Sequence, residues 1–376
     1  MKIPREPSGR FAWRPLVRLV RAPAALSVPG DVLSGAAAAG RPTDLRTLGA
    51  AASSVCLYWA GMALNDYADA TVDGVERPGR PVPSGAVERR TALAVATGLT
   101  AAGLALAAAC GRRRLVTATA LTAAVWAYDL RLKDTAAGPA TMAAARGIDV
   151  MMGGGVRAAA PAAAVALHTY GVTTLSRHEV SGGGRGAARV ALACAAGAAL
   201  TAGTLAARTA HASRRRLDLP LAGALFARYA SGYGRALTTL AAPRPATGPD
   251  DAFRSVTQQD AAVRSVARPG DAARSVTGQD AEDRSATRRD DDSRSAAPPG
   301  DASQSVARQD AEDRSFTPPQ DEAPAEQVAH AVQAGILALI PLQAALAAAC
   351  GAPLSAAVVA AADPLASRLV KAVPAT

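Results

Sequence analysis

Four oxygen-bearing side chains lie close together in residues 65–85, NDYADATVDGVERPGRPVPSG. They are Asn65, Asp66, Asp69 and Asp73, and they follow an apolar stretch that predicts the last turns of a helix. On a helix, positions 65, 69 and 73 share one face with position 66. Mg²⁺ prefers oxygen ligands and typically binds through one or two carboxylates plus substrate phosphates. The spacing therefore predicts a metal site, with Asp66, Asp69 and Asp73 as Mg²⁺ ligands.

Two arginines, Arg77 and Arg80, follow these acids in a loop that contains three prolines. A guanidinium group is well shaped for bidentate contact with phosphate oxygens. For any one of the acids, the alternative is an acidic helix end that pairs with the arginines of the next loop. The complete spacing favours a site for a metal-bound diphosphate at a membrane face.

Apolar windows of about 18 to 22 residues recur on both sides of this stretch, and this length is enough to cross a bilayer core. They predict an all-α fold, a polytopic membrane bundle of about nine transmembrane helices. A soluble alanine-rich bundle is the alternative, although small residues suit close helix packing in lipid. The windows are 22–40, 47–67, 91–110, 115–130, 138–156, 160–176, 187–207, 217–241 and 329–350, with a weaker one at 352–370.

Charge divides the chain into two parts. The net charge is +10 over 376 residues, but residues 250–326 contain ten arginines and 17 acids, so the rest of the chain carries +17. The basic residues 1–21 have the form of the n-region of a signal peptide, but more apolar windows follow. We therefore expect a retained first helix, a cytoplasmic N-terminus and an integral protein of a bacterial plasma membrane, surrounded by lipid.

A ten-residue repeat fills most of residues 250–326, and a serine recurs in it every ten residues, seven times, from Ser255 to Ser315. It has few large apolar residues to offset its chain entropy, so we expect a disordered insert. Its net negative charge argues against a nucleic-acid partner. The predicted organisation is a basic cytoplasmic N-terminus at 1–21, a transmembrane bundle at 22–249, the insert at 250–326 and a C-terminal transmembrane part at 327–376.

Asp149 is a carboxylate within an apolar window, where an acid is costly and usually faces a cavity or a partner. Arg146 lies three residues earlier on the same helix face. A structural ion pair between the two and a role in lining a cavity both remain open.

The stretch NDYADATVDGVERPGRPVPSG closely resembles the first aspartate-rich motif of the UbiA superfamily of intramembrane prenyltransferases. The resemblance covers the apolar chain on both sides of the repeat. It implies a helical bundle around a central cavity, with Mg²⁺ bridging the Asp-rich loops and the diphosphate of an isoprenoid donor. YDLRLK at 128–133 is similar to the family's Tyr-x-x-x-Leu-Lys loop. The diphosphate contacts implied on this side are Asn65, Arg77, Arg80 and Lys133, although a basic flank of a membrane helix is the alternative for the lysine.

The family's second motif, N-x-x-R-D-x-E-x-D, is expected after the sixth window, where this chain has TTLSRHEVSGGG. Aligned on its glutamate, Glu179 is kept, while the two aspartate positions are Arg177 and Ser181. Either Glu179 holds the second metal ion while Arg177 contacts the diphosphate, or the fold has lost its transfer chemistry. His178 is a candidate general base, with a solvated loop histidine as the alternative.

The predicted function is Mg²⁺-dependent transfer of an isoprenoid group from a polyprenyl diphosphate to an acceptor that the sequence does not identify. The metal ion and the basic residues would draw charge onto the leaving diphosphate, so that the allylic C–O bond ionises and the acceptor attacks the carbocation. A non-catalytic isoprenoid or lipid binding or transport protein of the same fold is the alternative, which the altered second motif favours. The catalytic residues expected are Asp66, Asp69, Asp73 and Glu179.

Overall fold

The computed structural model describes residues 13–179, 184–212, 218–242 and 323–372, and every regular element within them is a helix. These residues all belong to one compact unit, formed by Met1–Ala242 and Glu322–Thr376. The predicted all-α fold is therefore confirmed for this part of the chain. The repeat lies outside the described residues apart from 323–326, so its predicted disorder and the predicted division into domains stay predictions.

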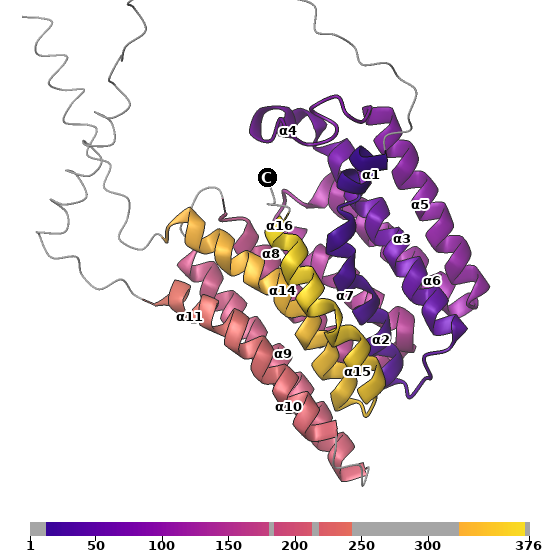
Figure 1. Ribbon diagram of the computed structural model, residues 1–376, viewed down its shortest axis with the longest axis vertical. Coiled ribbons are helices and arrows are strands. Elements are labelled where there is room, and N and C mark those ends of the chain that lie inside the picture. Colours follow the sequence, from indigo (N-terminus) through magenta and orange to yellow (C-terminus); the bar gives the residue numbers. More distant parts are fainter. Residues whose placement is uncertain (1–12, 180–183, 213–217, 243–322, 373–376) are drawn as a thin grey trace, which may run out of the picture. The chain divides into compact units, whose positions relative to one another are not determined.

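The described helices are shown in chain order by their colours in Figure 1. The first are α1 (Trp13–Leu19), η1 (Ala22–Ser27), α2 (Val28–Ala38), α3 (Leu45–Ala68), α4 (Ala70–Glu76), α5 (Arg89–Ala109), α6 (Arg112–Ala127) and η2 (Tyr128–Leu132). The next are α7 (Gly138–Gly154), η3 (Gly155–Ala158), α8 (Ala159–Ser176), α9 (Arg185–Ala212), α10 (Asp218–Tyr229), η4 (Ala230–Gly234) and α11 (Arg235–Ala241). The last are α14 (Ala325–Ala349), α15 (Pro353–Ala360) and α16 (Ala362–Ala372).

Five segments of the described chain are long and apolar enough to cross a membrane. The predicted membrane protein is thus confirmed, but the predicted count of about nine spans is not. Three helices at predicted windows, α2, α6 and α10, are 11, 16 and 12 residues long, which is short for a bilayer core. The five segments are Leu45–Ala68, Arg89–Ala109, Gly138–Ser176, Arg185–Thr209 and Ala325–Ala349.

Small residues bring the helices into close contact. The helix α7 packs on α2, α6 and α8, while α3 packs on α5. At the α2–α7 contact, a Cβ atom on Gly153 would clash with the carbonyl oxygen of Val32, and one on Gly154 would clash with that of Gly35. Backbones approach this closely only where side chains are absent, as is common where helices pack in membranes.

The helix α3 carries the Asp-rich stretch to one end of the bundle. It begins after Asp44, whose side chain accepts a hydrogen bond from the Thr47 N–H at 2.8 Å and so caps the first turn. It runs for 24 residues to Ala68, and Asp69 alone separates it from α4. The predicted metal-binding residues therefore occupy the C-terminal end of α3 and the short helix that follows it.

Candidate functional site

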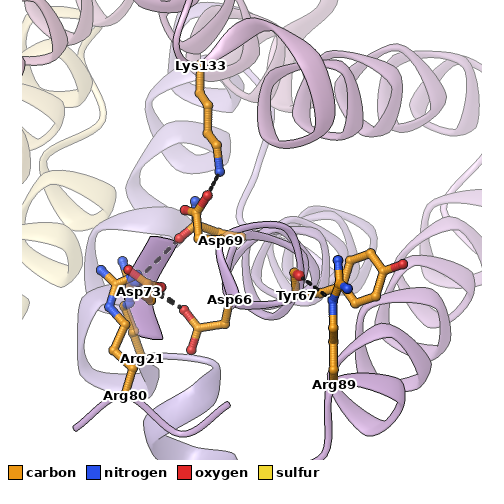
Figure 2. A network of polar contacts seen from close by, with 9 residues as sticks. Arg21, Asp66, Tyr67, Asp69, Asp73, Arg80, Arg89 and Lys133 are labelled. Carbon is orange, nitrogen blue, oxygen red and sulfur yellow. Dashed lines mark hydrogen bonds and ion pairs between the residues drawn. The ribbon is translucent and has the colours of Figure 1, made fainter. Parts of the chain in front are cut away.

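Asp69 lies at the junction of α3 and α4, where its backbone (φ −87°, ψ 1°) interrupts the helix. Helical hydrogen bonds nevertheless continue through the junction. The N–H of Asp69 donates to the carbonyl of Asn65 at 2.9 Å, and that of Asp73 donates to the carbonyl of Asp69 at 2.8 Å. The four-residue spacing expected from the sequence is thus kept in the backbone, while the carboxylates point to different partners (Figure 2).

Arg80 joins the first and last acids of this stretch. Its Nη1 lies 2.6 Å from Oδ2 of Asp73 and 3.8 Å from Oδ1 of Asp66. Asp66 and Asp73 are 2% and 3% exposed, so an unpaired charge on either would be costly. The guanidinium group of Arg80 therefore pairs with two buried carboxylates at once, those of Asp66 and Asp73.

Arg21 is a member of this group that the sequence analysis assigned to the basic N-terminus. Its Nη2 lies 3.3 Å from Oδ1 of Asp66 and 3.5 Å from Oδ1 of Asn65. Its backbone is left-handed (φ 46°, ψ 51°), and no other non-glycine residue of the described chain has a positive φ. That conformation costs about 1–3 kcal/mol and turns the chain between α1 and η1. A basic residue just before the first apolar window was the only signal in the sequence.

Lys133 reaches the same end of α3 from the C-terminus of η2. Its ammonium group forms an ion pair with Oδ1 of Asp69, across 64 residues of sequence (Figure 2). Asp129, a further acid that the sequence analysis missed, is buried beside Lys133 and Asn65. The YDLRLK segment and the first motif therefore meet in the structure.

The loop after α4 is anchored at one point by α1, and the start of α5, where the loop ends, is anchored to α3. Arg18 of α1 donates a hydrogen bond to the carbonyl of Gly79 at 3.2 Å. Arg89 of α5 donates to the carbonyl of Tyr67 at 3.1 Å and lies over its ring, with Cζ 4.5 Å from the ring centroid. These contacts support the segment from which Arg77 and Arg80 extend.

Glu179 lies in the turn after α8 and is half-buried. Burial raises the pKa of the Glu179 carboxyl group, and the positive charge of Arg77 partly opposes that rise. The second-motif segment thus faces the loop of the first motif. His178 packs against Gly184, where a Cβ atom would lie 3.1 Å from that of His178. Ser181 lies outside the described residues.

Arg177 contacts the backbone that follows η2. Its Nη2 donates to the carbonyl of Lys133 at 3.0 Å and to that of Thr135 at 2.5 Å. The guanidinium is exposed, so further donors are available to a ligand. The predicted contact of Arg177 with a diphosphate stays a prediction.

The acidic side chains of the site suit a metal ion that is held only in part by protein ligands. Among the described residues, no group of three or more His, Cys, Asp or Glu side chains converges on one point. The three first-motif carboxylates each pair with a basic residue instead. Their oxygens fit an ion that one or two carboxylates hold together with phosphate or water, as Mg²⁺ prefers. They do not form a cage made of protein ligands alone.

Asp149 and Arg146 belong to a separate polar cluster in the bundle interior. Arg146 pairs with Asp31 of α2, with 3.0 Å between Nη1 and Oδ2, while Asp149 accepts a hydrogen bond from Ser54 at 2.6 Å. The amide of Gln343 donates to Asp31 at 2.6 Å. Ser54 lies eleven residues before Asn65, which is about 16 Å along a helix. The cluster is therefore remote from the Asp-rich end and links α2, α3, α7 and α14.

Comparisons with known proteins agree with this geometry. Residues 29–202 match the model of the UbiA prenyltransferase family. The digeranylgeranylglyceryl phosphate synthase of Methanopyrus kandleri is 38% identical over 104 residues, which cover 28% of this chain and 38% of the relative. That of Ignicoccus hospitalis is 35% identical over 130 residues, which cover 35% of this chain and 42% of the relative. The chain thus aligns with less than half the length of either curated relative.

A solved structure has the same fold. A UbiA homolog from Archaeoglobus fulgidus, bound to GPP and Mg²⁺, superposes with a TM-score of 0.51 and 16% sequence identity. The superposition covers 66% of this chain and 96% of the homolog.

Proposed function

We propose that this chain, whose residues 29–202 match the model of the UbiA prenyltransferase family, is a member of that family and transfers an isoprenoid group from a polyprenyl diphosphate to an acceptor within the membrane. Mg²⁺ is the proposed cofactor. The proposal also includes the bacterial plasma membrane and the cytoplasmic N-terminus that the sequence predicts. Both relatives named above come from archaea.

The observation that carries the proposal is a set of acids and bases that neutralise one another at one end of α3. Asp66 pairs with Arg21, Asp73 with Arg80, and Asp69 with Lys133. A metal-bound diphosphate carries both signs of charge. Its metal ion suits the three carboxylates, and its phosphate oxygens suit the guanidinium and ammonium groups. Binding would exchange ion pairs within the chain for ion pairs with the ligand.

The first role of the chain is to bind and orient the diphosphate. The Asp-rich stretch is contacted by Arg21, Arg80 and Lys133. Arg77 extends from the same loop as Arg80. These groups would stabilise negative charge as it grows on the leaving group, because they are already in place and need little reorganisation. A bound Mg²⁺, held by one or two of the proposed ligands Asp66, Asp69, Asp73 and Glu179 together with phosphate or water, would supply Lewis-acid charge to the phosphate oxygens.

The second role is to keep water away from the reacting carbon. The apolar helices next to the site would exclude it, and attack by the acceptor would complete the transfer with release of diphosphate and a proton. Since the named relatives are digeranylgeranylglyceryl phosphate synthases, a prenylated glyceryl phosphate is the first acceptor to test.

Turnover in isolated membranes tests this proposal. Membranes containing the chain are supplied with geranyl or geranylgeranyl diphosphate and a panel of acceptors, with Mg²⁺ or with excess chelator. Mass spectrometry of the lipid extract measures prenylated product, and an enzymatic assay measures released diphosphate. We expect both products with Mg²⁺ and neither with the chelator.

The alternative, a non-catalytic isoprenoid-binding protein of the same fold, is supported by one observation, the loss of acids from the second motif. Mg²⁺-dependent binding of geranyl diphosphate without product from any acceptor would favour it. The absence of both binding and product would contradict both candidates.

A further inference from the structure

Arg177 stands at one of the two positions where the family's second motif has an aspartate, yet its guanidinium reaches the backbone of another segment. Nη2 donates to the carbonyls of Lys133 and Thr135, which are 44 and 42 residues away in sequence. The Lys133 carbonyl lies at the C-terminal end of η2, where carbonyl groups have no partners within the helix, and the Thr135 carbonyl follows two residues later. Arg177 therefore completes the hydrogen bonding of the turn that carries Lys133.

The same turn is fixed by its own residues. The N–H and the hydroxyl of Thr135 donate to the carbonyl of Leu132 at 3.0 and 2.7 Å, and the N–H of Gly138 donates to the carbonyl of Thr135 at 3.0 Å. A Cβ atom on Gly138 would lie only 2.6 Å from the carbonyl oxygen of Lys133. The Lys133 carbonyl thus lies between the start of α7 and the guanidinium of Arg177.

The side chain of Lys133 leaves this turn toward Asp69, with which it forms an ion pair (Figure 2). The path of a flexible lysine depends on where its backbone is held, because four rotatable bonds permit many end positions. Arg177 is the contact by which the second-motif segment holds that backbone. Arg177, which stands where the family's second motif has an aspartate, thereby helps to place the positive charge of Lys133 beside the first motif.

We propose that Arg177 is a positioning residue for Lys133, which it holds against the Asp-rich end of α3. The consequence of this positioning for donor binding rests on the proposed function: the ammonium group of Lys133 supplies positive charge to the diphosphate on the side where the second motif has lost acids. The placement of Lys133 itself does not depend on the reaction.

The reactivity of Lys133 tests the placement in the purified full-length protein without ligands. The chain has three lysines, Lys2, Lys133 and Lys371, so the acetylation rate of each is measured separately by mass spectrometry with an N-hydroxysuccinimide ester. In Arg177→Met the rate at Lys133 is expected to rise about fivefold, as loss of one or two hydrogen bonds allows, with no change at the other two lysines. Arg177→Gln, which keeps one donor, is expected to give a smaller rise.

The matched control is Arg131→Met, which removes an exposed arginine from the same helical turn. It should leave the rate at Lys133 unchanged. A Lys133 rate equal to the wild-type rate in both Arg177 variants would overturn the proposal. If Arg177→Met does not fold, as judged by thermal melting, the milder Arg177→Gln variant decides.

A double-mutant cycle separates positioning from direct contact with the ligand. Binding of geranyl diphosphate with Mg²⁺ is measured for Arg177→Met, Lys133→Met and the double variant. We expect Arg177→Met to weaken binding about tenfold and the double variant to bind no more weakly than Lys133→Met alone, since the two residues act together. Additive losses would show that Arg177 acts on the diphosphate itself, and would overturn the positioning role. If the wild type binds no donor, the proposed function fails while the acetylation rates still decide the role of Arg177.

Discussion

At the scale of residues, the acidic and basic side chains of the candidate site neutralise one another. Asp66 and Asp73 are almost fully buried, and both lie against Arg80, while Asp69 pairs with Lys133. Buried carboxylates persist only with such partners, because desolvation of an unpaired charge is costly. The same residues therefore explain both how the apoprotein keeps charged groups inside and why a ligand with both signs of charge suits it.

Removal of a first-motif acid should abolish donor binding. In Asp69→Ala and Asp73→Ala, the loss of a metal ligand and of an ion pair is expected to weaken Mg²⁺-dependent binding of geranyl diphosphate about 100-fold or more. The amount of protein in the membrane should stay the same. Glu76→Ala is the control, since Glu76 is an exposed acid of the same short helix. Unchanged binding in both aspartate variants would remove the basis of the proposed metal site.

Glu179 is the remaining acid of the altered second motif. Glu179→Gln keeps the size and shape of the side chain but removes the charge that Mg²⁺ needs, so turnover in membranes should fall about 100-fold or more. Product formation is measured at saturating donor. Wild-type turnover in Glu179→Gln would mean that the second half of the site lies elsewhere in the chain.

The pKa of Glu179 makes a prediction about stability. Because burial raises this pKa in the folded protein, the folded state holds the proton more tightly than the unfolded chain does. The stabilisation from the proton is complete below the unfolded pKa and is lost as pH rises through the raised value. Glu179→Gln should therefore gain thermal stability relative to wild type as pH rises above about 4, the ordinary pKa of a glutamate. Melting temperatures in detergent measure this, and a constant difference would contradict it.

At the scale of elements, glycines set how closely α7 approaches α2. Gly153→Ala should destabilise the protein by about 1–3 kcal/mol, because the added Cβ atom meets the carbonyl oxygen of Val32. Gly98→Ala in α5 is the matched control, since nothing lies within 4 Å of a Cβ atom there. A helical glycine changed to alanine in open space should be neutral or stabilising by up to about 1 kcal/mol. Thermal melting of both variants decides, and equal melting temperatures would refute the close contact.

The elements also determine which segments form the site. Four segments reach the Asp-rich residues or one another. They are the end of α3, the chain before η1, the turn after η2 and the turn after α8. Apart from the end of α3, each contributes only one or two side chains.

At the scale of the whole molecule, the ten-residue repeat separates α11 from α14 in sequence. Replacement of residues 250–322 by a flexible linker should leave membrane insertion and any turnover largely intact, because the composition of this segment predicts a disordered insert. The replacement should stop at 322, since Ala323 is buried and α14 begins at Ala325. Membrane fractionation and product assays measure the outcome. Loss of the folded protein would show that the segment is structural.

The sequence by itself determined the helical class, the membrane setting and the chemistry of the Asp-rich stretch. Runs of apolar residues and the four-residue spacing of Asn65, Asp69 and Asp73 are local properties, so they can be read directly along the chain. The tertiary structure decided which charges meet. Arg21 reaches Asp66 across 45 residues, and Arg177 reaches the backbone of Lys133 across 44. Arg146, which the sequence placed beside Asp149, pairs with Asp31 of another helix. Such partners depend on how helices pack and where the backbone turns, and neither is encoded in the spacing of neighbouring residues.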